Sequence, residues 1–112
     1  MTYFVRPVRN QFWLKRHDTL PGIEIVLPAG LDLTGAVATL IMSDRQSGVV
    51  LAQGPCTIVT VGSETVAQYA WAPGDTAAAA ICLLEVEIDV PGGGVTTEPP
   101  NGGIEVLIDA DL

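Results

Sequence analysis

The sequence predicts an all-β domain, arranged as an antiparallel sandwich of two sheets. Apolar and polar side chains alternate in several short segments, which is the pattern of strands with one buried face and one face in water. Gly, Pro, Asp and Asn separate those segments, and these residues favour turns. The chain has 112 residues, of which 48% are hydrophobic and 16% charged. That length is enough for one core and too short for two.

The clearest strands lie near the C-terminal end, at residues 84–90 and 104–111. In both, every second residue is apolar, so one face should enter the core while the other carries carboxylates into water. We interpret these carboxylates as outer-surface residues and not as the lining of a reactive pocket. The residues predicted to face outward are Glu85, Glu87, Asp89, Glu105, Asp109 and Asp111.

Weaker strand patterns cover much of the remaining chain. They occupy residues 11–15, 23–27, 36–43, 49–52, 56–61 and 65–71, and residues 95–98 close a hairpin over the turn 91–94. Roughly eight or nine short strands in total fit a sandwich. Pro73, followed by the alanine run 77–80, predicts a turn or two of helix at most. Residues 101–103 predict a turn before the last strand.

The front of the chain differs from the rest in charge and aromatic content. Its first 16 residues carry +4 and the remainder −12, and four of the six aromatic residues lie among the first 13. The net charge of −8 repels phosphate backbones, so no nucleic-acid partner is expected. No apolar run reaches the roughly 18 residues that span a bilayer, and the opening lacks the apolar core of a signal peptide, so no membrane partner is expected.

Residues 1–10 are predicted to form an extended N-terminal arm, followed by a β-sandwich domain over residues 11–112. Aromatic and arginine side chains are enriched in interface cores. The acidic body of another copy would attract this basic arm, so we expect a homo-oligomer or a multi-copy assembly. Two alternatives are a first strand packed on its own domain and a frayed terminus. The predicted partner-binding residues are Tyr3, Phe4, Val5, Arg6, Val8 and Arg9.

No set of residues predicts a catalytic, cofactor-binding or metal site. His17 is the only histidine, and no serine carries the sequence signature of an activated nucleophile. Cys56 and Cys82 lie in apolar segments, where an unpaired thiol packs as a small hydrophobic group; one disulfide or a reactive thiol is the alternative. Two cysteines without neighbouring histidines do not complete a tetrahedral zinc site. We therefore expect no cofactor and no enzymatic activity.

Five turn and strand-end motifs follow one another in a fixed order. In that order they resemble bacteriophage and prophage proteins related to the immunoglobulin-like N-terminal domain of the phage baseplate upper protein. The motifs are Asp18-Thr19-Leu20-Pro21, Asp32-Leu33-Thr34-Gly35-Ala36, Tyr69-Ala70-Trp71-Ala72-Pro73-Gly74-Asp75-Thr76, Glu85-Val86-Glu87 and Pro100-Asn101-Gly102-Gly103.

The resemblance implies an immunoglobulin-like sandwich in a non-enzymatic virion structural protein. Such a protein would be an adaptor in the tail or baseplate, or a decoration protein on the capsid, bound to neighbouring virion subunits after synthesis in the host bacterial cytoplasm. The alternative is a carbohydrate-binding module that contacts host-surface glycans, because sandwiches often present aromatic side chains to sugars. Tyr69, Trp71 and the arm are the candidates for that platform.

Overall fold

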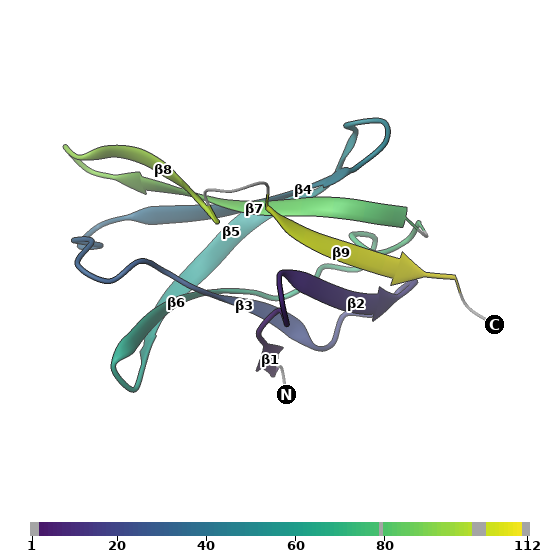
Figure 1. Ribbon diagram of the computed structural model, residues 1–112, viewed down its shortest axis with the longest axis horizontal. Coiled ribbons are helices and arrows are strands. Elements are labelled where there is room, and N and C mark those ends of the chain that lie inside the picture. The colour runs from purple at the N-terminus through teal and green to yellow at the C-terminus, as the bar shows by residue number, and fades with distance from the viewer. Residues whose placement is uncertain (1–2, 79, 100–102, 111–112) are drawn as a thin grey trace.

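The computed structural model describes residues 3–78, 80–99 and 103–110, and nine strands make up its regular structure (Figure 1). Residues 73–76 form a turn and Ala80 begins a strand, so the described residues of the range 73–80 contain no helix, where the sequence allowed a turn or two. The all-β prediction is confirmed. The strands are β1 (Phe4–Val5), β2 (Gln11–Lys15), β3 (Gly22–Val26), β4 (Val37–Asp44), β5 (Val50–Val61), β6 (Glu64–Tyr69), β7 (Ala80–Val90), β8 (Gly94–Glu98) and β9 (Ile104–Asp109).

The strands follow one hydrogen-bonded path, in the order β1-β3-β6-β5-β4-β7-β9-β2, with β8 on β7. β5 keeps the path continuous, because its first half pairs with β4 and its second half with β6. The sheet curls, so that β3 and β6 lie across from β4, β7 and β9 (Figure 1). The pairs β1–β3 and β2–β9 are parallel. A purely antiparallel arrangement was therefore wrong for these pairs, whose strands no hairpin joins.

β5 runs through Gly54 and Pro55, where the sequence pattern predicted two separate strands. Pro55 pairs with Thr39 of β4, and the pairing with β6 begins only at Thr57. A strand residue with a neighbour on one side tolerates the missing N–H of proline. Gly54 lies under the ring of Tyr69, since a Cβ at that position would stand 3.1 Å from Cε1 of the ring.

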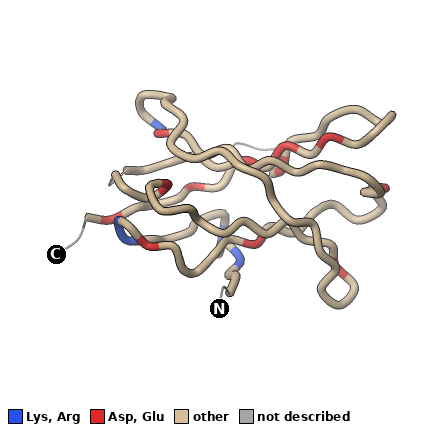
Figure 2. Tube along the Cα trace, turned by 180° about the vertical axis from the view of Figure 1, so that it is seen from behind, with Lys and Arg blue, Asp and Glu red and all other residues tan. Residues whose placement is uncertain are grey.

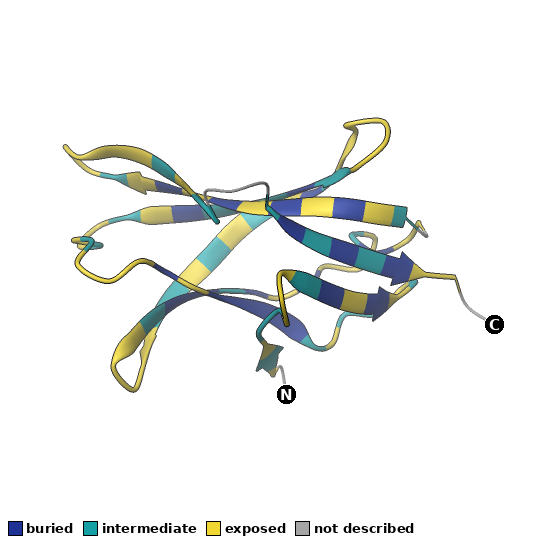
Figure 3. Cartoon of the chain, in the orientation of Figure 1, coloured by how far each residue is buried: buried dark blue, intermediate teal, exposed yellow. Residues whose placement is uncertain are grey.

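The core fills the space enclosed by the curled sheet, with dark-blue buried positions alternating with yellow exposed ones along β7 and β2 (Figure 3). The central inward residues of β7, from Cys82 to Ile88, are fully buried, and Glu85, Glu87 and Asp89 on its other side are exposed. Asp109 is exposed as well, whereas Glu105 is half-buried and Asp111 lies outside the described residues. The outward placement predicted for the carboxylates is therefore confirmed for Glu85, Glu87, Asp89 and Asp109. Buried core residues include Phe12, Leu14, Ile23, Ile25, Leu40, Met42, Val66, Trp71, Leu84, Val86, Ile88, Val106 and Ile108.

Two of the turn motifs bond to one another at one end of the core. The indole Nε1 of Trp71 donates to the carbonyl of Pro21 at 3.0 Å, and the hydroxyl of Thr76 donates to the carbonyl of Asp18 at 2.8 Å. The hydroxyl of Tyr69 donates to Oδ2 of Asp75 at 2.7 Å. These bonds fix the segments 18–21 and 69–76 together. The turn expected at residues 101–103 falls largely on residues 100–102, which lie outside the described residues.

Candidate interaction surface

Residues 3–10 lie along their own domain. β1 pairs in parallel with β3, placing Phe4 opposite Gly22 and Val5 opposite Ile23. The N–H of Gly22 donates to the carbonyl of Tyr3 at 2.8 Å. The described part of the predicted arm is thus a first strand packed on its own domain, the first of the two alternatives, and a free extended arm is not what residues 3–10 adopt.

Phe4 fills the space that the missing side chain of Gly22 leaves open. A Cβ on Gly22 would stand 2.5 Å from Cδ1 of Phe4 and 2.8 Å from the carbonyl oxygen of Tyr69. Only glycine allows the aromatic ring and the β6 backbone to approach this closely. Phe4 therefore anchors the segment to the domain and is half-buried there.

Arg6 forms a second anchor through two carboxylates. Its Nε donates to Oε2 of Glu24 and its Nη1 to Oε1 of Glu64, each at 2.9 Å. Glu24 is 9% exposed and also accepts a 2.7 Å bond from the side-chain amide of Gln68. Burial alone would raise the pKa of Glu24, but the bonds from Gln68 and Arg6 outweigh it and lower the pKa below 4.5. This clamp joins the N-terminal segment to β3 and β6.

A two-residue turn joins the segment to β2. Val8 and Gln11 exchange backbone bonds of 2.9 and 3.0 Å, so Arg9 and Asn10 occupy the tip. Both have positive φ, at 53° and 61°. This is the type I′ geometry that Asn-Gly adopts most easily, and a left-handed conformation costs an ordinary side chain roughly 1–2 kcal/mol. The turn therefore holds Arg9 in a strained backbone conformation at an exposed position.

The six predicted partner-binding residues separate into two groups. Phe4 and Arg6 face their own domain, as described above. The others are exposed, and Val8 at the turn is 66% accessible. Exposed aliphatic and aromatic side chains together with an arginine match the residue types that are enriched in interface cores. The exposed group is Tyr3, Val5, Val8 and Arg9.

Trp13 is an exposed aromatic residue that the sequence-based list of candidates omitted. It is 54% exposed on β2, between the buried Phe12 and Leu14. The alternation with those two residues was the signal that could have placed it on the surface. The strand register puts Trp13 beside Leu107 and Leu107 beside Ile81, so these three side chains form a row across β2, β9 and β7. We call Tyr3, Val5, Val8, Arg9 and Trp13 the exposed N-terminal residues.

The outer edge of β2 is closed at both ends by local turns. Successive residues of a strand direct their backbone groups to opposite sides, and those of Gln11, Trp13 and Lys15 face away from β9. Gln11 is paired with Val8, and the N–H and C=O of Lys15 are bonded to the side chain and the N–H of Asp18. Only the backbone of Trp13 lies open between them. Contact with a partner at this edge therefore relies on side chains.

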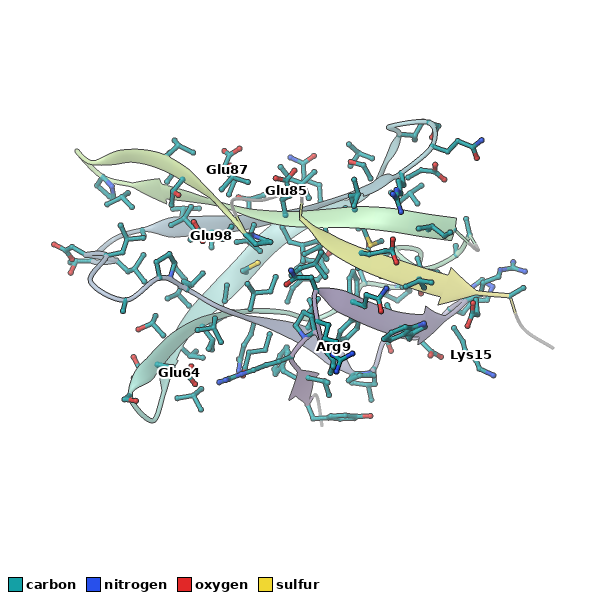
Figure 4. The ribbon with its side chains drawn as sticks, viewed as in Figure 1. Arg9, Lys15, Glu64, Glu85, Glu87 and Glu98 are labelled. Carbon is teal, nitrogen blue, oxygen red and sulfur yellow. The ribbon has the colours of Figure 1, made fainter. Side chains whose placement is uncertain are left out.

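Basic residues are unevenly placed on the molecule. Lys and Arg lie in the part that holds both termini, apart from Arg45 in the β4–β5 loop, whereas Asp and Glu are spread over the whole molecule and also lie beside the basic residues (Figure 2). Glu85 and Glu87 point away from the body on the side opposite to Arg9 and Lys15 (Figure 4). Complementary surfaces on two copies can thus approach with opposite charges facing each other.

The remaining titratable residues are not gathered into a reactive centre within the described part of the chain. His17 is exposed in a turn with φ of 69°, and its N–H donates to the carbonyl of Thr76 at 3.0 Å. No group of three His, Cys, Asp or Glu side chains in residues 3–78, 80–99 and 103–110 is placed to hold a metal ion. A cleft of about 220 Å³ beside the N-terminal segment has Glu98 as its one titratable lining residue among those described.

The two cysteines are free and far apart. Cys56 lies opposite Ala38 and Cys82 lies opposite Asp44 on β4. Six residues of extended strand correspond to roughly 20 Å, which no disulfide spans. Burial raises the pKa of each thiol to about 11. Unpaired thiols in apolar surroundings, as predicted, are therefore confirmed.

No family model, curated protein or solved structure matches this chain. Within the described residues, no helix is long and apolar enough to cross a membrane.

Proposed function

We propose that this chain is a non-enzymatic structural protein of a bacteriophage or prophage virion. It acts as an immunoglobulin-like adaptor in the tail or baseplate, or on the capsid, and binds neighbouring virion subunits through the exposed N-terminal residues. Its activity is binding, with a rigid β domain presenting one surface to its neighbours.

The observation that carries the proposal is that the aromatic side chains exposed on the described surface, Tyr3 and Trp13, both lie in the first 13 residues of an acidic protein. Val8 is 66% and Trp13 54% exposed, and Arg9 follows Val8 at the exposed turn. Trp, Tyr and Arg are the residues that most often dominate the binding energy of interfaces. The closed edge of β2 supports contact by these side chains, since it limits unspecific strand addition.

The immunoglobulin-like assignment has support from the turn motifs. The bonds from Trp71 to Pro21 and from Thr76 to Asp18 join two motifs that are far apart in sequence. Residues that carry the resemblance thus have structural roles in closing the core. The curled sheet, whose faces enclose that core, is compatible with a sandwich.

The glycan-binding alternative has less support. Tyr69 and Trp71 are 6% and 4% exposed and are fixed by hydrogen bonds to Asp75 and Pro21. A sugar-binding platform needs exposed ring faces, which these two residues do not offer on the folded surface. Tyr3 and Trp13, which are 55% and 54% exposed, would have to supply it.

Substitutions at the exposed residues test the proposal better than deletion of residues 1–10, which would also remove Phe4 and Arg6 from the fold. Trp13→Ser and the double variant Val8→Ser/Arg9→Ser should enter particles at least about tenfold less than the wild type, as for the loss of interface anchors. Glu87→Gln, at an exposed position on the opposite side, is the matched control. Equal incorporation of all four proteins would contradict the proposed binding surface.

A further inference from the structure

The N-terminal segment is held by Gly22, Glu24 and Glu64, which are distant from it in sequence. We call these three residues the seat of the segment. The space above Gly22 receives Phe4, and the carboxylates of Glu24 and Glu64 receive Arg6. All three receiving residues belong to β3 or β6. A second copy of this chain presents the same three groups, so its seat could hold the segment with the same contacts.

The connection between segment and body is the strained part of the arrangement. The turn at Arg9 and Asn10 holds two consecutive residues other than glycine at positive φ. Opening it into extended chain would remove that strain and leave the anchors of Phe4 and Arg6 available to either copy. Short hinge loops under strain favour exchange of an element between two copies.

The length and charge of the segment fit such an exchange. Residues 3–10 span roughly 26 Å when extended, while the shortest dimension of the molecule is 24 Å. Residues 3–10 carry Arg6 and Arg9 and no acidic residue, whereas residues 17–112 carry −12, so each segment is attracted by the other body. Val8, exposed at the turn, would lie where the two extended segments cross, and there it would become covered.

We propose that two copies of this chain exchange their N-terminal segments, so that residues 3–8 of each occupy the seat formed by β3 and β6 of the other. This inference rests on the proposed function, in that it names a second copy as one neighbouring subunit. Figure 4 shows Arg9 at the hinge and Glu64 on the seat side of the molecule.

Sedimentation equilibrium of the full chain tests the hinge. The wild type should show a concentration-dependent species of twice 11.7 kDa. The variant Arg9→Asn/Asn10→Gly builds the favoured type I′ sequence, so its dimer should dissociate at a concentration roughly tenfold higher or more. A wild type that stays monomeric up to millimolar concentration overturns the proposal, and so does a dimer that this variant does not weaken.

A pair of charge-reversed chains tests the exchange itself. Arg6→Glu repels its own seat, and Glu24→Arg/Glu64→Arg repels its own segment, but the two are complementary to each other. Mixed, they should form a dimer with one copy of each in native mass spectrometry, and separately they should not. The triple variant carrying all three changes has a segment and a seat of opposite charge again, so it should regain the self-association of the wild type, which controls for folding.

Glu64→Arg alone replaces the double variant if that does not fold, because the Glu64 side chain is 46% exposed. A mixture that yields only monomers contradicts the exchange. The proposed function would survive that result if the wild type still entered particles. Conversely, if the chains exchange segments in solution but are absent from particles, the proposed function is contradicted and the exchange is not.

Discussion

The ring of Phe4 occupies the place that a side chain on Gly22 would need. An added Cβ would stand 2.5 and 2.6 Å from two carbons of that ring. This contact joins the first strand of the chain to β3 and explains why a glycine opens that strand. It also makes the position of the N-terminal segment sensitive to a single methyl group.

Gly22→Ala should lower the free energy of unfolding by about 1–3 kcal/mol, the usual cost of overpacking. The cost should be smaller when Phe4 is first replaced by alanine, because the ring then no longer competes for the space. An added Cβ would still stand 2.8 Å from the carbonyl oxygen of Tyr69, so Gly22→Ala should remain destabilising in the Phe4→Ala background. Urea unfolding of the wild type, the two single variants and the double variant gives the coupling free energy between positions 4 and 22. Strictly additive effects would show that Phe4 does not occupy this site.

The two tryptophans should behave in opposite ways. Trp71 is 4% exposed and donates to the Pro21 carbonyl, so Trp71→Ala should cost about 3–5 kcal/mol. Trp13 lies on the outer face, so Trp13→Ser should change stability by less than about 0.5 kcal/mol. Thermal unfolding of both variants measures this contrast. A large loss of stability in Trp13→Ser would assign that residue to the core and remove it from the binding surface.

The clamp at Glu24 predicts a specific dependence on pH. Although burial opposes it, the bonds from Gln68 and Arg6 lower the pKa of Glu24 in the folded protein below 4.5. Its stabilising contribution is therefore present above pH 4.5 and is lost as the pH falls through the lower folded value. Arg6→Met should be less stable than the wild type at pH 7, and the gap should narrow toward pH 3.

Urea titrations at several pH values measure that gap, and Arg45→Met is the matched control because Arg45 pairs with Glu105 elsewhere on the surface at 2.8 Å. A gap between wild type and Arg6→Met that stays constant from pH 7 to pH 3 would argue against the clamp.

The bond between Tyr69 and Asp75 should stabilise the turn that closes the core. Asp75→Ala leaves both the Tyr69 hydroxyl and the N–H of Ala72 without the carboxylate that accepts from them. The expected loss is about 1–3 kcal/mol, whereas Tyr69→Phe removes a single bond and should cost about 0.5–1.5 kcal/mol. Chemical denaturation compares the two, and a larger loss in Tyr69→Phe would contradict this arrangement.

The cysteines should react slowly in the native state. Burial raises the pKa of both thiols to about 11, and the thiolate is the reactive form. At pH 8 a thiol reagent should therefore label neither cysteine readily, and it should label both rapidly in denaturant. Fast labelling of Cys82 in the folded protein would contradict its burial in β7.

The local sequence pattern is sufficient to predict the strands with alternating side chains and the hairpin between adjacent strands. The strand at residues 11–15 was placed with its observed ends, and the inward and outward faces of β7 followed from period-two alternation. The hairpin over residues 91–94 followed from the glycines between two strand patterns. These features depend on neighbours in sequence, which is why the sequence predicts them.

The pairing of strands that are distant in sequence could not be predicted from the local pattern. Nothing in the pattern of residues 1–10 selects β3 as the neighbour of β1, because that choice depends on the space above Gly22 and on the carboxylates of Glu24 and Glu64. The composition of residues 1–10 indicates a candidate interaction surface, but it does not indicate that Phe4 and Arg6 anchor the segment to its own domain. The alternation that buries Phe12 and Leu14 places Trp13 on the outer face of β2.

Quantitative mass spectrometry of gradient-purified phage particles tests the proposed role in the virion. If the chain is a virion structural protein, its copy number per particle should be constant through repeated gradients and high-salt washes. A copy number that falls with each purification step, toward the level of unrelated host proteins, would contradict a structural role in the particle.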